Sequence, residues 1–255
     1  MYGACGVSGF LLGMLYLFFA CKKYHEDFGN LVYVYVWSAL GAVLGAKILY
    51  LLIEIRTIVS ILVTYGLTLN GLSELLGGGF VFYGGLFGAL IAAVLASNYF
   101  HLEKKHTIPI LTPALPLAHA FGRIGCAMVG CCYGMEIEHG IGIIYRHSKY
   151  APNGVKLFPV QAVEACGDLI IFCVLLKVLS KTLQKKDSGG IVLQIYLACY
   201  AIMRFFLEFF RGDQIRGGLW KLSTSQWISL LILGGLVAYK LVAGKGSGLP
   251  DKTVP

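Results

Sequence analysis

The chain has 255 residues, of which 57% are hydrophobic and only 13% are charged. A water-soluble domain of this length carries roughly twice that charged fraction, and the mean hydropathy of +0.75 points the same way. We therefore predict an all-α integral membrane protein with no room for a sizeable soluble domain. The formal charge of +8 does not indicate nucleic acid binding, because the bases lie in short runs between apolar stretches.

Seven apolar windows, bounded by Gly, Pro or charged residues, are each long enough to cross a bilayer as a helix. No Lys or Arg precedes the first window, so we expect it to remain a helix and not to act as a signal peptide. We predict a bundle of about seven transmembrane helices in a single domain over residues 1–245, with a disordered tail over 246–255. The windows are 6–21, 31–54, 80–99, 109–132, 158–178, 190–210 and 226–243.

The distribution of Lys and Arg predicts the orientation, because cytoplasmic loops carry an excess of basic residues. If the spans alternate, the more basic side holds the C-terminus, which places the N-terminus outside the cell. Between spans, residues 55–79 are expected to be interfacial and residues 133–157 to form an extramembrane arm. The basic residues of the predicted cytoplasmic side are Lys22, Lys23, Lys104, Lys105, Lys181, Lys185, Lys186, Lys240, Lys245 and Lys252.

Four charged residues fall within or at the edges of the predicted spans. They are Lys47, Arg123, Arg204 and Glu208. Each costs about 2.5–3.5 kcal/mol at the centre of a membrane helix when it has no partner. We therefore expect these side chains to face the bundle interior and to form pairs.

The sixth span carries a polar stripe made of Tyr200, Arg204, Glu208 and Arg211. On a continuous helix, at 100° per residue, these four positions fall within roughly 80° of arc. A purely stabilising role is the alternative, but intrahelical ion pairs contribute only a few tenths of a kcal/mol, far below the insertion cost. The stripe therefore favours a functional anion site.

The fourth span contains Arg123 together with Gly130 and Gly134. If the helix continues, these residues lie along one line, and an anion can rest in a groove lined by backbone. For the glycines alone, a packing face against a neighbouring helix is the more plausible interpretation. That interpretation does not account for Arg123.

Two further polar positions leave alternatives open. Tyr83 lies between glycines at the start of the third span, where it either lines a polar cavity or anchors the helix at the interface. Glu164 follows Phe158 and Pro159 on the fifth span, where it is either an arginine partner or solvated.

Three of the eight cysteines, Cys126, Cys131 and Cys132, cluster around Arg123 in the sequence. The positive charge favours a reactive thiolate, whereas apolar burial opposes it. Zinc is not expected, because no second Cys/His pair with ligand spacing accompanies them. A disulfide between the adjacent Cys131 and Cys132 is disfavoured because it strains the backbone.

The order of these features resembles the prolipoprotein diacylglyceryl transferase family over about residues 1–245. Members of this bacterial family move a diacylglyceryl group from phosphatidylglycerol to the lipobox cysteine of secreted preproteins. The resemblance implies a phosphate-binding role for Arg123 and carries the family's sixth-span residues onto the polar stripe. The matching segments are a YG pair near the start, GAKILYLL, FVFYGGLFG, GRIGCAMVGCCYG, FPVQAVEA, YAIMRFFLEFFRGDQ and LSTSQWISL.

The sequence departs from the family pattern in the half of the site that handles the acceptor. Cys126 stands where the family has Asn, and residues 129–131 read Val-Gly-Cys where the family has Asn-Gly-Glu. Tyr83 replaces a histidine proposed as a base, and Lys47 replaces an arginine. Tyrosine is a weak base at neutral pH, so we expect the acceptor to lose its proton by a route different from that of the family.

The resemblance implies a transferase that uses phosphatidylglycerol, an anionic phospholipid, as donor and a protein or peptide thiol as acceptor, with release of glycerol phosphate. We expect it in the bacterial cell membrane, without nucleic acid, metal or other cofactor. Two alternatives remain open: a paralogue with another acceptor, or a redox or structural membrane thiol protein with bound lipid. The predicted catalytic residues are Tyr83, Arg204, Glu208 and Cys131, and the predicted substrate-binding residues are Arg123, Arg211, Tyr200, Cys126 and Gly134.

Overall fold

The computed structural model describes residues 2–66, 68, 69, 71, 79–184, 190–213, 218, 219 and 222–246. Within these ranges the chain is almost entirely helical, which confirms the all-α class. The strands form two short antiparallel pairs, β1 (Ile143–Ile144) with β2 (Lys156–Leu157), and β3 (Gly218–Leu219) with β4 (Leu222–Ser223). Of the predicted tail, residues 247–255 lie outside the described residues, as do residues 72–78 before the third span.

Each of the seven predicted windows contains a helix. In the described part of the chain, five helices are long and apolar enough to cross a membrane, namely α1, α2, α5, α9 with its following turn, and α10. The chain is therefore a multi-pass membrane protein, while the full number of seven spans stays a prediction. The helices are α1 (Tyr2–Tyr24), α2 (Phe28–Ile53), α3 (Ile55–Tyr65), α5 (Phe82–Tyr99), α6 (Lys104–Leu111), α7 (Ala114–Val129), α8 (Val160–Gln184), α9 (Gly190–Leu207), the 3₁₀ turn η1 (Glu208–Phe210) and α10 (Thr224–Gly246).

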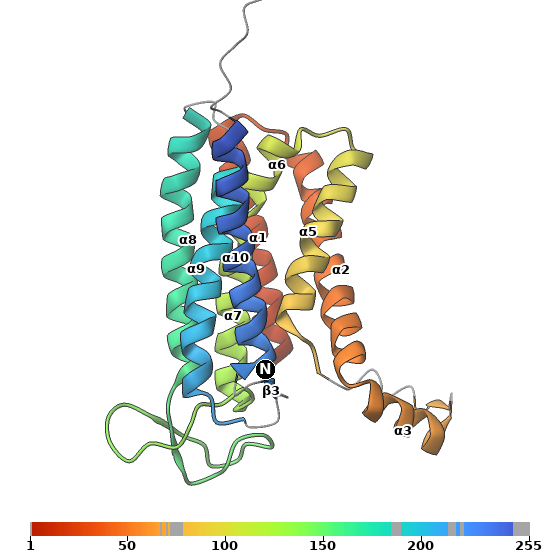
Figure 1. Cartoon of the computed structure of the whole chain (residues 1–255), viewed down its shortest axis with the longest axis vertical. Helices are drawn as coiled ribbons and strands as arrows, with labels where there is room; N and C mark the ends of the chain where they lie inside the picture. The colour runs from red at the N-terminus through yellow and green to blue at the C-terminus, as the bar shows by residue number, and fades with distance from the viewer. Residues whose placement is uncertain are drawn as a thin grey trace, which may run out of the picture. The chain divides into compact units, whose positions relative to one another are not determined.

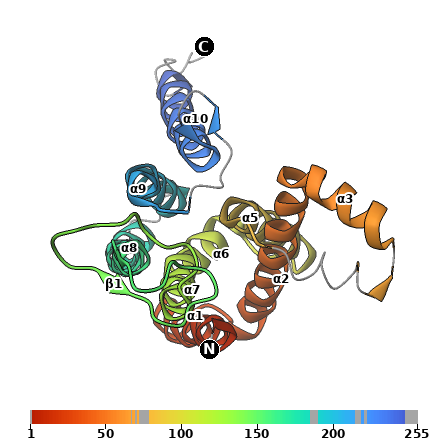
Figure 2. The same cartoon turned by 90° about the horizontal axis from the view of Figure 1, so that it is seen from below.

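The chain divides into two compact units, one made of Met1–Tyr16 with Pro109–Pro255 and the other of Leu17–Ile108. In the first unit, α7, α8, α9 and α10 follow one another side by side in chain order, as Figure 2 shows. The beginning of α1 lies along α7, where Gly9 contacts the backbone of Ala118 and Gly125 contacts Tyr2 and Cys5. The single domain expected over 1–245 stays a prediction.

In the second unit, α2 and α5 pack against each other in antiparallel directions (Figure 1). Gly41 and Gly45 of α2 face Gly88 and Gly84 of α5 so closely that an added Cβ on any of them meets the backbone of the partner helix. Small residues spaced four apart on both helices are typical of close packing within membranes. The sequence analysis did not single out these four glycines.

The expected extramembrane arm connects α7 to α8 and meets the chain beyond α9. Met135 N–H donates to the carbonyl of Phe210, and Gly212 N–H donates to the carbonyl of Tyr133. Gly134 and Arg211 form an isolated β-bridge. The arm therefore joins the end of α7, the start of α8 and the end of α9 at one end of the unit, below these helices in Figure 1.

Candidate functional site

The centre of the candidate site is the carboxylate of Glu164 on α8, which is fully buried. Its Oε1 atom lies 2.9 Å from Nη2 of Arg123, and its Oε2 atom lies 3.9 Å from Nη1 of Arg204. The hydroxyl of Tyr200 donates to Oε1 over 3.4 Å. Of the two interpretations left open for Glu164, the arginine partner is confirmed, and one carboxylate joins α7, α8 and α9.

The polar stripe predicted on the sixth span is only partly helical. Arg204 is buried on α9 and pairs with Glu208 over 2.5 Å, and its Nη2 also donates to Ser225 over 3.3 Å. However, α9 ends at Leu207, Glu208 lies in the 3₁₀ turn, and the backbone at Arg211 is extended. The prediction of one continuous helical stripe is therefore wrong at its last two positions.

Arg211 is held by a carboxylate that the sequence analysis did not identify. Its Nε and Nη2 atoms donate to the two oxygens of Asp213 over 2.8 and 2.7 Å. A bidentate pair of this kind fixes the plane of the guanidinium group. Asp213 therefore orients Arg211.

The line of Arg123, Gly130 and Gly134 predicted along the fourth span does not form. α7 ends at Val129, because Gly130 takes a left-handed conformation with φ 82° and caps the helix. Gly134 lies beyond this turn, in contact with the carbonyl of Phe158. The prediction of a groove along this helix is therefore wrong, whereas the substrate-binding role of Gly134 stays a prediction.

The ion pairs balance in charge and still leave guanidinium donors unused. Arg123, Arg204 and Arg211 are matched by Glu164, Glu208 and Asp213. Nevertheless, Nε of Arg123, Nη1 of Arg204 and Nη1 of Arg211 are buried without a hydrogen-bond acceptor among the described residues. Carboxylate oxygens of Glu164, Asp168 and Glu208 are also buried without a hydrogen-bond partner among the described residues. Buried polar groups nearly always have partners, so donors and acceptors of this centre are both available to a polar ligand.

A second buried pair lies next to this centre and was not predicted. Nδ1 of His119 on α7 lies 2.7 Å from Oδ2 of Asp168 on α8. The ring of His119 meets the ring of Tyr200 edge to face, with centroids 5.5 Å apart. The spacing could have suggested the pair, because His119 precedes Arg123, and Asp168 follows Glu164, by one helical turn.

The three cysteines predicted to cluster near Arg123 do lie together. The Sγ atoms of Cys126, Cys131 and Cys132 are all within 4.8 Å of one another. Cys126 belongs to the last turn of α7, and Cys131 and Cys132 follow the cap at Gly130.

The thiols beyond the helix differ in their ionisation. Hydrogen bonds from the thiols of Cys126 and Cys131, together with the guanidinium groups of Arg123 and Arg211, hold the pKa of Cys132 below its usual range. Hydrogen bonding to the other two cysteines raises the pKa of Cys131. The thiol of Cys132 is therefore more acidic than that of Cys131, and the catalytic role of Cys131 stays a prediction.

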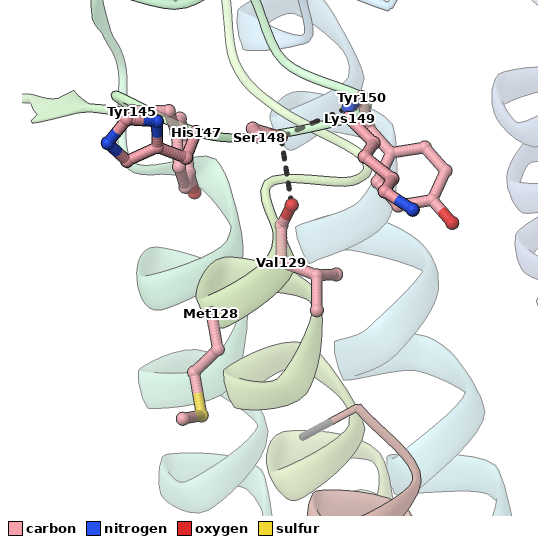
Figure 3. Close-up of a pocket in the computed structure, with 7 residues that line it drawn as sticks. All are labelled: Met128, Val129, Tyr145, His147, Ser148, Lys149 and Tyr150. Atoms are coloured by element: carbon pink, nitrogen blue, oxygen red, sulfur yellow. Dashed lines mark hydrogen bonds between the residues drawn. The ribbon is translucent and has the colours of Figure 1, made fainter.

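A hollow of about 400 Å³ lies where the arm covers the end of α7. Figure 3 shows Ser148 donating a hydrogen bond to the carbonyl of Val129 over 2.9 Å. Tyr145 and His147 lie on one side of Ser148, and Lys149 and Tyr150 lie on the other. This cationic and aromatic hollow lies on the arm, close in sequence to the cysteine cluster.

The two remaining predicted positions belong to the other unit. Tyr83 is buried in the first turn of α5, with its ring edge to face with that of Phe82. The ammonium group of Lys47 lies over the rings of Tyr50 and Phe80, 5.0 and 5.2 Å from their centroids. Cation–π contacts of this kind stabilise a charge in an apolar setting. The catalytic role of Tyr83 stays a prediction.

Comparisons of this chain with a family model and with individual proteins point to the same family. A family model described as prolipoprotein diacylglyceryl transferase matches residues 1–241. Phosphatidylglycerol–prolipoprotein diacylglyceryl transferase 2 of Clostridium perfringens is 35% identical over 226 residues, which cover 88% of this chain and 83% of the relative. The transferase of Clostridium tetani is 32% identical over 243 residues, covering 94% and 92%. That of Finegoldia magna is 26% identical over 239 residues, covering 94% and 90%.

Proposed function

The chain belongs to the prolipoprotein diacylglyceryl transferase family, and on that premise we propose that it transfers a diacylglyceryl group from phosphatidylglycerol to a cysteine thiol of a prolipoprotein. Glycerol phosphate is the second product. The printed names of the relatives supply the donor and the acceptor. The observation that carries the proposal in this chain is that Arg123 and Arg204 share the buried carboxylate of Glu164, while one guanidinium nitrogen of each has no hydrogen-bond partner among the described residues.

The three arginines suit a phosphodiester that becomes a phosphomonoester. Arg123, Arg204 and Arg211 are each held by a carboxylate, so their unused N–H groups are already oriented when the lipid arrives. As the carbon–oxygen bond breaks, the leaving glycerol phosphate gains a second negative charge. Fixed donors directed at developing charge stabilise it more than water does, because they need no reorganisation. Arg123, Arg211 and Tyr200 bind the donor, and Arg204 with Glu208 stabilises the leaving group.

The part of the proposed site that handles the acceptor differs from the family pattern, because it contains thiols. Cys126 and Cys131 replace polar residues of the family pattern and lie within 4.8 Å of Cys132. Gly134 places the arm close to Phe158, since its missing side chain permits backbone contact. Tyr83, the remaining candidate for a proton acceptor, belongs to the other unit.

We further propose that the protein lies in the bacterial cell membrane with its N-terminus outside and its C-terminus in the cytoplasm. In the first unit, Lys181 and Lys240 lie in the later turns of α8 and α10, away from the arm end where these helices begin. The arm, with the candidate site beside it, is then on the outer side. Secreted prolipoproteins present their lipobox cysteine on that side.

Lipid transfer by the purified chain tests this proposal directly. The protein is incubated with radiolabelled phosphatidylglycerol and a lipobox peptide, and glycerol phosphate release and peptide lipidation are followed. Arg123→Ala is expected to lower the rate about 100-fold or more, because it removes a fixed hydrogen-bond donor to the phosphate of the lipid. Arg146→Ala, which removes an exposed arginine of the arm, is the matched control and leaves the rate unchanged.

The products distinguish the alternatives. Release of glycerol phosphate only with some acceptor other than a lipobox cysteine would retain the donor and replace the acceptor. No release with any acceptor would contradict the transferase and favour a redox or structural protein with bound lipid.

A further inference from the structure

Three thiols meet at the turn where α7 ends. The Sγ atoms of Cys126, Cys131 and Cys132 lie within 4.8 Å of one another. In the described part of the chain, no further histidine, cysteine or carboxylate ligand atom belongs to this group. We propose that these cysteines bind a zinc ion with three thiolates and leave the fourth coordination position open for the thiol of the acceptor peptide.

The spacing of the sulfur atoms fits a metal of this size. In a tetrahedral site with zinc–sulfur bonds of about 2.3 Å, neighbouring sulfur atoms are about 3.8 Å apart. The three Sγ atoms lie within 4.8 Å of one another, so their largest separation exceeds that value by at most about 1 Å.

The backbone at the turn is shaped to bring the thiols together. Gly130 has φ 82° and Cys132 has φ 56°, so two left-handed residues in three reverse the chain over the last turn of α7. The left-handed region is costly for a side chain with a Cβ, and such conformations cluster at functional sites. Cys131 and Cys132 are adjacent in the chain, and the left-handed conformation of Cys132 accompanies the placement of both thiols in the cluster with Cys126.

Hydrogen bonds from neighbouring elements fix this turn. The amide of Gln161 on α8 donates to the carbonyl of Cys131 over 2.9 Å. The hydroxyl of Tyr145 on the arm donates to the carbonyl of Ala127, and Ser148 donates to that of Val129, each over 2.9 Å. These contacts hold the backbone that carries the three cysteines.

A zinc ion held by three thiolates carries a net charge of −1, which becomes −2 when a fourth thiolate binds. Thiolate sulfur is one of the ligands that zinc takes in both structural and catalytic protein sites.

Three ligands, not four, distinguish a catalytic zinc site from a structural one. Structural sites close the coordination sphere with four protein ligands, whereas catalytic sites keep one position for water or substrate. Cys131 and Cys132 are partly exposed, so an incoming thiol can reach the metal from their side.

The role of the open position rests on the proposed lipid transfer. A thiol that binds zinc loses its proton, here to water, and remains a nucleophile. Its sulfur then forms a bond to the glycerol carbon of phosphatidylglycerol, and the bond from that carbon to the phosphate oxygen breaks. The electron pair leaves on glycerol phosphate, which the arginines stabilise. The product thioether is uncharged and releases the metal more readily than the thiolate.

Cadmium, a larger d¹⁰ ion that binds thiolates and absorbs in the near ultraviolet, tests the site without any lipid. The full chain is purified in detergent, reduced, stripped of metal and titrated with Cd²⁺. We expect one ion per chain, displaced by zinc, with a sulfur-to-metal absorption band. The band disappears in Cys126→Ser/Cys131→Ser/Cys132→Ser and is unchanged in Cys166→Ser/Cys173→Ser, which removes two exposed thiols of α8.

A peptide titration tests the open position. A lipobox peptide added to the cadmium-loaded chain, without phosphatidylglycerol, is expected to raise the absorption band by about one third, as three thiolates become four. The same peptide with serine in place of cysteine is expected to change nothing. If the triple variant does not fold, Cys131→Ser alone is expected to lower the band of the loaded protein by about one third.

The outcomes separate this inference from the proposed function. If the reduced chain binds no metal, or forms only a reversible disulfide among these thiols, the zinc site is wrong. Lipid transfer at an unchanged rate in the metal-stripped protein would likewise overturn the inference and leave the transferase intact. Metal and peptide binding with no glycerol phosphate release from any lipid would retain the site and contradict the transferase.

Discussion

The α2–α5 pair and the α7–α8–α9 group are both sets of apolar helices, but their contacts differ in kind. Between α2 and α5, four glycines bring the backbones together, and the buried positions of α5 are mostly small residues. Between α7, α8 and α9, apolar contacts are joined by buried ion pairs centred on Glu164.

The difference matters because the two kinds of contact have different costs in a membrane. Glycine contacts bury no charge and gain van der Waals packing over the length of the helices. Ion pairs lose hydration at several kcal/mol for each ion, which the mutual attraction only partly offsets. Buried charge is therefore weak evidence for stability, and in this molecule we propose that it lies where a ligand binds. Variants in the two regions test whether the glycine contacts determine stability and the ion pairs determine activity.

Removal of the central carboxylate is expected to have the largest effect. In Glu164→Gln the shape is kept, but Arg123 and Arg204 lose their shared counter-charge. Breaking a buried pair costs about 3–5 kcal/mol, so we expect the rate of glycerol phosphate release to fall by about 100-fold or more. Glu138→Gln, on the exposed arm, is the control. A rate within twofold of the parent chain would show that Glu164 does not hold the arginines.

A methyl group between α2 and α5 is expected to destabilise the fold without touching the arginines. In Gly45→Ala the new Cβ meets the backbone of Gly84 and Gly88, so the helices must separate. Overpacking of this kind costs about 1–3 kcal/mol, measurable as a lower midpoint of thermal unfolding in detergent. Gly234→Ala on α10, where nothing lies within 4 Å, should instead be neutral or stabilising. Equal midpoints in both variants would count against the packing argument.

Loosening one arginine is expected to weaken donor binding. Asp213→Asn removes the charge from the bidentate pair that orients Arg211. Hydrogen bonds to charged groups contribute about 1.5–3 kcal/mol, so we expect KM for phosphatidylglycerol to rise about tenfold or more. Glu138→Gln again serves as the control. A change in kcat alone, with KM unchanged, would place Arg211 in the chemical step and not in donor binding.

The smallest effect is expected at the cap that holds the arm. Ser148 donates to the carbonyl of Val129, and its Oγ atom accepts from the N–H groups of Tyr150 and Ala151. Ser148→Ala should cost about 1 kcal/mol and accelerate proteolysis within the arm. Ser180→Ala removes a hydroxyl that bonds only within α8 and should leave the cleavage rate unchanged. Identical digestion of the two variants would contradict the role of Ser148.

The helices themselves were predictable because they depend on local composition. Every apolar window contains a helix, and residue charge marked Arg123, Arg204 and Glu208 as positions in need of partners. The partners of these charges were harder to predict. The sequence analysis left Glu164 either as an arginine partner or as a solvated residue, and it missed Asp213 and the His119–Asp168 pair. Pairing across helices depends on which faces of the helices pack together.

Errors in the sequence analysis occurred where a helix ended earlier than its apolar pattern. The polar stripe and the line of Arg123 with Gly130 and Gly134 both assumed uninterrupted helices. The structure ends α7 at Val129, where Gly130 takes a positive φ, and ends α9 at Leu207. Apolar residues continue past both points, so hydrophobicity alone cannot indicate the break.

The sequence by itself therefore determined the membrane class, the helical architecture, the family and the charged residues that require partners, because each follows from local composition, an ordered set of motifs or the cost of an unpaired charge in lipid. Only the tertiary structure decided which carboxylate meets which arginine. Those contacts join distant segments of the chain, and their geometry depends on where helices end and which faces pack.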